Sequence, residues 1–506
     1  MDACKAASSE RFANRVLGIH RFVNRSLVAR LLQYMLPDDT TATAAPASPL
    51  VRQLGKNALV VDADALLLKP APGAAFPPYF LVAFEAGGYV RGLVLLALYP
   101  VLSVLSHGAR AKAMAFVSFC GLRRDEAARI GRAVLPKLFF REAPGMHAAM
   151  EPLNALPEKV KVVAVSQTFP TVMVEAFLKE YVGFDAVAGR ELEGGSRYLT
   201  GVTTELDMES LAARVVLMKQ TDKTSKTASC SYYPKPMVFH DGRLAFTPTP
   251  AAALAMYMYL PFAVVLAVLR IAIYVLLPWR VSSVVAGLTG VRVRVIGATP
   301  AAEDGDDDAG GTGKPCSGRL YACNHRTLLD PVGIACALRR PVAAVTYSLS
   351  RLSEVLSPIP LRRLTRNRDE DRRRMSAMLA RGDVVVCPEG TTCREPYLLR
   401  FSPLFAELAP EVTPVAVDAR TTVFYATSTS PIAKSFDSVY FLMNPRPEYS
   451  VQFLEPVNTE SGKSSIELAN EVQGALAAAL GFEGTALTRK DKYLLLAGNE
   501  GVVKTQ

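Results

Sequence analysis

The sequence predicts two α/β domains joined by an apolar helical segment that contacts a membrane. Short apolar runs with the character of buried strands occur in both halves of the chain, at 58–62 and 160–166 and again at 412–417. Between the halves, residues 251–269 contain no charged side chain. A chain of 506 residues is also too long for one hydrophobic core, so two domains are expected.

The composition agrees with membrane contact. Half of the residues (50%) are hydrophobic, only 21% are charged, and the mean hydropathy is +0.19. The formal net charge of +10 is compatible with nucleic acid, an anionic membrane surface or an anionic substrate. The chain has no compact block of Lys and Arg, and of its basic clusters only 362–374 lies beside a chemical motif. We therefore expect no nucleic-acid partner.

The eight cysteines indicate the compartment of the protein. None of them has the CxxC spacing that is typical of metal ligands. We therefore expect reduced thiols that face a cytosolic compartment, and no metal site.

Residues 1–50 predict a variable N-terminal tether, because they are rich in Ala, Thr, Ser and Pro after a short basic stretch. Residues 1–30 lack the apolar core of a signal peptide, so cleavage is not expected, and an organellar transit peptide remains an alternative. The first α/β domain is expected at 51–245. Its second strand, at 160–166, precedes a helix at 170–181.

Two apolar stretches predict helices. The first, 92–105, is about 14 residues long, whereas roughly 20 are needed to cross a bilayer. It therefore predicts either a buried or re-entrant helix or a membrane span. The second stretch, 250–280, continues its apolar character past Arg270. It predicts a membrane segment, either a helical hairpin around Pro261 or one tilted span.

The second α/β domain is expected at 285–506. It begins with a strand-like run at 291–297. A flexible acidic loop at 300–317 follows, because its acids and glycines are too polar to pack. The remainder alternates short apolar runs with helical patterns.

His325 and Asp330 have the residue types of a general base and its orienting carboxylate. A neutral imidazole takes a hydroxyl proton, and a carboxylate on its other nitrogen fixes the tautomer. Five residues on a regular helix separate two side chains by about 140°. The pair therefore requires His325 at a strand-to-helix turn and Asp330 one turn into the helix. The same spacing also arises by chance in a chain with five histidines.

Two further blocks follow in the same half. Residues 357–368 form a Pro-bounded loop whose arginines, Arg363 and Arg366 among them, can hold a phosphate through paired hydrogen bonds. The alternative, a solvated helix face paired with acids, fits 372–374 better. Residues 384–395 form a buried strand that ends in Pro-Glu-Gly-Thr-Thr, and open α/β sheets bind ligands at that edge.

These blocks, in this order, resemble the glycerolipid acyltransferase family. They are NHRTLLD, PIPLRRLTR, PEGTTCRE and VTPVAV, at 324–330, 358–366, 388–395 and 412–417. The likeness extends to the plant glycerol-3-phosphate acyltransferases of the endoplasmic reticulum. It covers nearly everything from Leu54 onward, through stretches at 76–102, 239–250, 445–457 and 481–501.

The resemblance implies an enzyme of the endoplasmic-reticulum membrane, with a mitochondrial membrane as the alternative. It would transfer an acyl group from acyl-CoA to the sn-1 or sn-2 hydroxyl of glycerol 3-phosphate, without a cofactor or a covalent acyl-enzyme. In land plants such products feed cutin or suberin synthesis. The resemblance makes His325 the general base and Asp330 its orienting partner. It assigns glycerol 3-phosphate binding to Arg363, Arg366, Glu389, Gly390, Thr391, Thr392 and Arg394.

The first domain resembles phosphatases of the haloacid dehalogenase (HAD) type. Their first motif is DxDGT, and this chain keeps Asp62 and Asp64 but has Ala-Leu in place of Gly-Thr. Ser166 stands at the second motif, whereas 198–234 contains no Gly-Asp pair to hold Mg²⁺. We therefore expect a vestigial phosphatase without bound Mg²⁺, so that lysophosphatidic acid is the product. A bifunctional enzyme that releases 2-monoacylglycerol and an inactive membrane scaffold are the alternatives.

Overall fold

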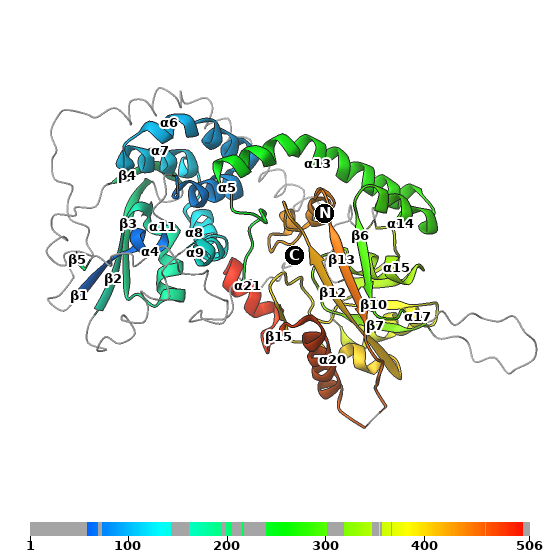
Figure 1. The fold of residues 1–506 in the computed structure, drawn as a ribbon. Helices are drawn as coiled ribbons and strands as arrows, with labels where there is room; N and C mark the ends of the chain where they lie inside the picture. Colours follow the sequence, from blue (N-terminus) through cyan, green and yellow to red (C-terminus); the bar gives the residue numbers. More distant parts are fainter. Residues whose placement is uncertain are drawn as a thin grey trace, which may run out of the picture. The chain divides into compact units, whose positions relative to one another are not determined.

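The computed structural model shows two α/β units (Figure 1). One unit comprises Met1–Gly242 and Thr247–Tyr257, and the other comprises Arg243–Phe246 and Met258–Gln506. The predicted tether at 1–50, most of the acidic loop at 300–317 and Arg366 lie outside the described residues. The structure describes residues 58–68, 73–142, 161–194, 198–204, 215–216, 239–300, 318–346, 354, 357–365, 367–460 and 462–498.

The first unit is built on a sheet whose described strands have the order β4-β3-β2-β1-β5. All neighbouring pairs are parallel except β3 and β4, which are antiparallel. The two strands predicted from apolar runs are β1 and β2, and they pair with each other. The bounds are β1 Ala58–Asp62, β2 Lys161–Pro170, β3 Ala186–Gly194, β4 Leu199–Thr204 and β5 Val215–Val216.

The described first unit also contains helices. The predicted helix at 170–181 is α11, which ends at Phe177 and continues as a π-helical turn at Leu178–Val182. Phe177 and its aromatic neighbours on α9 form the apolar contact between these helices. The bounds are α4 Ala63–Leu67, α5 Phe76–Ala97, α6 Tyr99–Val104, α7 His107–Phe119, α8 Arg124–Ala133, α9 Leu135–Glu142 and α11 Thr171–Phe177.

The stretch at 92–105, predicted as one apolar helix, is helical in two pieces. The chain forms the end of α5, a break at Leu98, and the short helix α6. Pro100 lies in the first turn of α6, where the missing N–H of proline costs no hydrogen bond. A second interruption lies inside α5, where Gly88 has φ 70°, a left-handed conformation that glycine adopts readily. The apolar run at 92–105 is continuous across the break at Leu98 and so does not reveal it.

The segment predicted at 250–280 is one helix, α13 (Pro250–Leu276), which continues through Pro261 (Figure 1). Of the two alternatives predicted for this segment, the hairpin around Pro261 is therefore wrong. The chain turns only at Pro278, before α14 (Trp279–Leu288). At 27 residues, α13 is about 40 Å long, enough for a tilted span.

Two described helices, α5 and α13, have the length and apolar composition of a membrane span. Protein buries 44% of the most apolar stretch of α5 and 22% of that of α13. The less buried helix, α13, is the better candidate for lipid contact, because most of its apolar surface has no protein neighbour.

Arg270 explains how a charge is tolerated inside the apolar sequence of α13. Its side chain is fully buried in the second unit. All five of its N–H donors have acceptors: Nε donates to the Thr289 hydroxyl, and the two Nη groups donate to backbone carbonyls. These carbonyls belong to Thr289, Leu442, Asn444 and Pro445, at 2.5, 2.6, 2.6 and 3.0 Å.

The second unit is built on a larger sheet with the described order β6-β13-β12-β7-β10-β8-β9, and β14 pairs with β12. Strand β12 is antiparallel to β13 and β14, and the other pairs are parallel. The predicted runs at 291–297 and 384–395 contain β6 and β10, and the run at 412–417 lies within β12. The bounds are β6 Arg292–Ile296, β7 Leu320–Cys323, β8 Ala343–Thr346, β9 Leu361–Arg363, β10 Val384–Val386, β12 Glu411–Arg420, β13 Glu448–Phe453 and β14 Val457–Asn458.

Helices and loops complete the second unit around this sheet. Its main core joins apolar residues of β7, β10 and β12 to those of α17 and α20. Two short strands, β11 (Tyr397–Leu398) and β15 (Glu483–Gly484), form a separate parallel pair. The helix bounds are α15 Asp330–Leu338, α17 Arg368–Leu379, η3 Pro403–Glu407, α18 Pro431–Lys434, α19 Asp437–Leu442, α20 Ser465–Leu480 and α21 Arg489–Ala497. The predicted fold class is confirmed.

Candidate active site

His325 lies in the turn between β7 and α15, and Asp330 is the first residue of α15. The Nδ1 of His325 is 2.9 Å from Oδ2 of Asp330. His325 thus lies at the predicted strand-to-helix turn, whereas Asp330 begins the helix and does not lie one turn into it. The turn itself is fixed to the sheet by Asn324, whose side-chain amide donates to Val417 O and accepts from Val417 N, both at 2.8 Å.

The Asp330 carboxylate is completely buried and acts as an acceptor. The backbone N–H groups of Arg326 and Thr327 donate to Oδ2 at 2.6 and 2.9 Å, and the Thr327 hydroxyl donates to Oδ1 at 3.1 Å. A carboxylate held in this way requires Nδ1 of His325 to carry a proton, so in the neutral ring Nε2 is the nitrogen that can accept one. The ring is also hydrogen-bonded to Cys387. Burial lowers the pKa of His325, but the neighbouring Cys387 and Asp330 outweigh that effect and raise it.

Glu389 follows β10, the strand beside β7. Its Oε1 accepts from His325 N at 2.7 Å and its Oε2 accepts from Leu399 N at 2.9 Å. The side chain is 4% exposed, and burial raises the pKa of Glu389 to about 7, although the bonds from Leu399 and His325 lower it. Because each oxygen accepts from a backbone N–H group, this geometry gives Glu389 a role in positioning His325. The predicted contact of Glu389 with substrate stays a prediction.

The other predicted binding residues are only partly brought together. Gly390 lines a cavity with His325, whereas the side chains of Thr391 and Thr392 are buried. Arg394 is hydrogen-bonded to Thr427 and lies 4.3 Å from the centre of the Tyr425 ring. Arg363 lies on β9 in an ion pair with Glu354 and is not among the residues that line the cavity.

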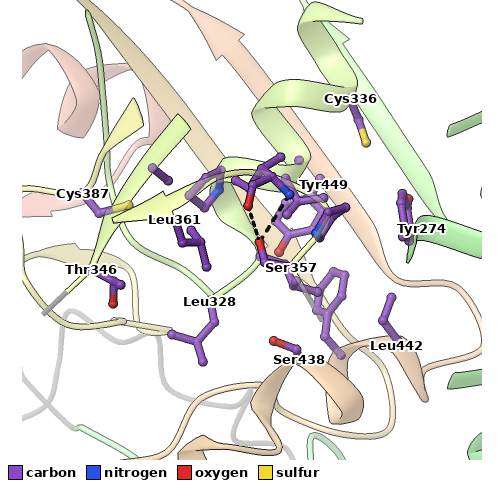
Figure 2. A pocket seen from close by; sticks show the side chains of 18 of the residues that line it. Tyr274, Leu328, Cys336, Thr346, Ser357, Leu361, Cys387, Ser438, Leu442 and Tyr449 are labelled. Carbon is purple, nitrogen blue, oxygen red and sulfur yellow. Dashed lines mark hydrogen bonds between the residues drawn. The ribbon is translucent and has the colours of Figure 1, made fainter. Parts of the chain in front are cut away.

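The cavity beside His325 has a volume of about 180 Å³. Figure 2 shows Cys387 and Thr346 on one side and Tyr274 and Cys336 on the opposite side. Most of its wall is apolar, whereas Lys434 adds a positive charge to the lining. The apolar part of the lining includes Ile271, Val291, Val293, Leu328, Leu329, Val332, Ile359, Leu361, Phe441 and Leu442.

Sequence reasoning missed Cys387, Lys434 and Tyr449 in this lining. Tyr449 lies on β13, and its hydroxyl is hydrogen-bonded to that of Thr327. Cys387 directly precedes the PEGTTCRE block, so its place in the chain could have drawn attention to it. Tyr449 lies in the stretch at 445–457 that carries the resemblance, but no role was assigned to it there. Lys434 belongs to no stretch that the resemblance identified, and the fold brings both residues to the cavity beside His325.

Asp62, Asp64 and Ser166 meet in the first unit, where β1 ends beside β2. Asp62 caps α4 by accepting from Asp64 N at 2.9 Å. Asp64 accepts from the Ser166 hydroxyl at 2.5 Å and from Gln167 N and Thr168 N at 2.9 and 2.8 Å. Burial raises the pKa of Asp64, and the bonds from Ser166 and Thr168 lower it. The polar groups of a phosphatase motif are thus satisfied by one another.

The described residues contain no group of three or more His, Cys, Asp and Glu side chains that could hold a metal ion. Most of 198–234, where the second acidic pair of a phosphatase was sought, lies outside the described residues. The prediction that the first unit lacks Mg²⁺ therefore stays a prediction.

Two family models match the chain. The model for the HAD-like domain of RAM2-like glycerol-3-phosphate acyltransferases matches residues 58–239, and an acyltransferase model matches residues 310–424. The protein named PlsC, a 1-acyl-sn-glycerophosphate acyltransferase from Thermotoga maritima, is 13% identical with a TM-score of 0.28, and covers 45% of this chain and 94% of that one. That likeness is too low to support an argument about the fold.

Curated relatives match nearly the whole chain. "Probable glycerol-3-phosphate acyltransferase 3" of Arabidopsis thaliana is 41% identical over 502 residues, which are 91% of this chain and 93% of that protein. "Glycerol-3-phosphate acyltransferase 1" of the same plant is 40% identical, over 89% of this chain and 83% of its own. "Glycerol-3-phosphate acyltransferase RAM2" of Petunia hybrida is 39% identical, over 86% of this chain and 96% of its own.

A HAD-like domain followed by an acyltransferase domain defines the chain as a two-domain acyltransferase. The sequence identity to the plant relatives, and the share of the chain that these matches cover, identify the family. The chain belongs to the plant glycerol-3-phosphate acyltransferases. The resemblance drawn from the four sequence blocks is confirmed.

Proposed function

We propose that this protein transfers an acyl group from acyl-CoA to a hydroxyl of glycerol 3-phosphate and releases lysophosphatidic acid. The observation that carries the proposal is the His325–Asp330 pair at the wall of a largely apolar cavity. The relatives are named for glycerol 3-phosphate as the substrate, and the acyl-CoA donor is our inference from the resemblance.

The chemistry follows from the orientation of His325. With Nδ1 held by Asp330, Nε2 accepts the proton of the glycerol hydroxyl as its oxygen attacks the thioester carbonyl. Asp330 stabilises the imidazolium that forms. The C–S bond then breaks, and the proton passes to the departing coenzyme A thiolate. Direct transfer of this kind needs no cofactor.

The two substrates require different surroundings, and the cavity offers both. Its apolar wall can bury an acyl chain, which gains about 0.8 kcal/mol for each CH₂ removed from water. Lys434 supplies a cation in the lining near which the phosphate of glycerol 3-phosphate can bind. Arg363 and Arg394 stay candidates for this role only if substrate binding releases them from Glu354 and Thr427.

Chain-length preference gives a prediction for the far side of the cavity. Cys336→Phe adds a ring opposite Cys387 and should lower kcat/KM for long-chain acyl-CoA by about tenfold more than for medium-chain acyl-CoA. Cys336→Ser, which keeps the volume, is the matched control and should leave the ratio unchanged. The measurement is initial rate against acyl-CoA of different lengths. An equal loss with all donors would show that the acyl chain lies elsewhere.

We further propose that the first unit does not remove the phosphate. Asp64, the second Asp of the phosphatase-like motif, is enclosed by Ser166 and the backbone of β2. Asp64→Asn, which preserves the shape, is therefore expected to leave the product as lysophosphatidic acid, with acyl transfer within about twofold of wild type. Monoacylglycerol from the wild type that disappears in Asp64→Asn would instead establish the bifunctional alternative.

The deciding experiment is an assay of microsomes that contain the full chain, with labelled glycerol 3-phosphate and acyl-CoA, resolved by chromatography. Labelled lysophosphatidic acid above the level of control microsomes supports the proposal. No labelled lipid from a well-expressed chain would favour the membrane-scaffold alternative.

We propose the endoplasmic-reticulum membrane as the location, with the catalytic unit facing the cytosol. We further propose that the product enters polyester or glycerolipid synthesis.

A further inference from the structure

Two cysteine thiols lie side by side next to His325. Ala322 and Val386 pair in register on the parallel strands β7 and β10, so Cys323 and Cys387 are the next opposed residues. Their Sγ atoms are 3.5 Å apart. Neighbouring strands lie about 4.8 Å apart, which is within the roughly 4.4–6.8 Å between Cα atoms that a disulfide bridges.

The two thiols differ in access and in acidity. Cys387 lines the cavity together with His325, whereas Cys323 is fully buried. The hydrogen bond with Cys323 and the nearby His325 lower the pKa of the Cys387 thiol, although burial raises it. The bond to Cys387 and burial both raise the pKa of Cys323. Since the thiolate is the reactive form, Cys387 is the thiol that meets an oxidant first.

We propose that Cys387 and Cys323 form a peroxide-reactive dithiol whose oxidation to a disulfide stops acyl transfer. In the first step the Cys387 thiolate attacks one peroxide oxygen, the O–O bond breaks, and water leaves with one added proton. Cys387 is then a sulfenic acid. In the second step the Cys323 sulfur attacks the Cys387 sulfur and a second water leaves. Two thiols are oxidised by two electrons, and one hydrogen peroxide is reduced to two waters.

Forming the disulfide would move His325, because each of the two cysteines directly precedes a segment that positions His325. The sulfurs must close from 3.5 Å to about 2.05 Å. Cys323 immediately precedes Asn324 and His325, and Cys387 precedes the Pro388–Glu389 turn that accepts the His325 N–H. A shift of about 1 Å at a catalytic group can lower a rate by about 100-fold. The loss of activity rests on the proposed function, whereas formation of the disulfide does not.

The first test maps the disulfide directly. The full chain in detergent micelles is treated with hydrogen peroxide, alkylated and digested with trypsin. Residues 320–326 and 382–394 are then separate tryptic peptides, and they should be found linked, and unlinked again after dithiothreitol. Because 382–394 also contains Cys393, the same experiment on Cys393→Ser identifies Cys387 as the partner. Peptides that stay unlinked after Cys387 has been oxidised would overturn the proposal.

The second test measures recovery of activity, with each preparation compared with its own untreated rate. Peroxide should lower acyl transfer by wild type at least about tenfold, and dithiothreitol should restore it. In Cys323→Ala no resolving thiol protects Cys387, so prolonged exposure should oxidise it irreversibly and dithiothreitol should not restore the rate. Cys336→Ala, which removes another cysteine of the cavity, should recover like wild type. Equal recovery of Cys323→Ala and wild type would contradict the proposal.

The two tests separate the dithiol from the proposed function. The mapping uses wild-type chain, so it decides even if Cys323→Ala does not fold. An untreated wild type without acyltransferase activity would contradict the proposed function, and linked peptides would still establish the dithiol.

Discussion

Replacing His325 with alanine is expected to lower acyl transfer to glycerol 3-phosphate by about 10²–10⁴-fold, the usual contribution of a general base. The change removes the nitrogen that accepts the hydroxyl proton. It should not unfold the chain, because the buried Asp330 carboxylate keeps its bonds from Arg326 N and from the Thr327 N–H and hydroxyl. The measurement is the rate of labelled lysophosphatidic acid formation at saturating acyl-CoA, together with the melting temperature.

Asp330→Asn is the matched variant, because it preserves the shape and removes the charge that fixes the tautomer. The amide can turn its NH₂ toward Nδ1 and so favour the tautomer with the proton on Nε2, which cannot accept another. We expect kcat to fall by about 10²–10⁴-fold with little change in KM. A His325→Ala variant that folds and retains more than about a tenth of wild-type activity would exclude His325 as the base.

The local part of this site could be predicted from the sequence. His325 and Asp330 are five residues apart, so a strand followed by a turn and a helix brings them together whatever the rest of the fold. The same holds for the way Asp62 caps the helix that follows β1. In each case one short segment supplies both partners, and local backbone geometry is enough.

The non-local part could not be predicted, because it depends on strand order. Glu389 reaches His325, and Cys387 reaches Cys323, only because β10 is the parallel neighbour of β7. Nothing in the apolar runs specifies that order. The resemblance assigned Glu389 to substrate binding and did not show that its two oxygens accept from the backbone N–H groups of His325 and Leu399. The sequence predicted that Arg363 binds phosphate. It did not reveal the ion pair with Glu354, which lies on a preceding segment.

Arg270 shows the same limit in the membrane segment. In the sequence Arg270 interrupts an apolar run. In the structure, however, it is buried and its N–H donors have hydrogen-bond acceptors. Its carbonyl partners on Leu442, Asn444 and Pro445 lie at and just after the end of α19, 172 to 175 residues further along the chain. Leu442 also lines the cavity. Arg270 thus connects α13 to the wall of the candidate active site.

Arg270→Leu is therefore expected to destabilise the second unit by about 3–5 kcal/mol, because it leaves several buried carbonyl oxygens without donors. Arg270→Lys keeps the charge but has three donors in place of five, so it should recover only part of the loss. Arg294→Leu, at an exposed position of β6, is the surface control and should change stability by less than about 0.5 kcal/mol.

The measurement for these variants is thermal unfolding of the full chain in detergent, where such a loss corresponds to a fall of roughly 10 °C in Tm. The acyl-CoA dependence of the rate distinguishes support of the cavity from general stability. If the bonds of Arg270 to the segment after α19 shape the cavity wall, Arg270→Lys should raise KM for acyl-CoA at temperatures where it remains folded. A Tm and a KM that both stay at wild-type values in Arg270→Leu would mean that the carbonyls find other donors, and that the charge in α13 has no structural role.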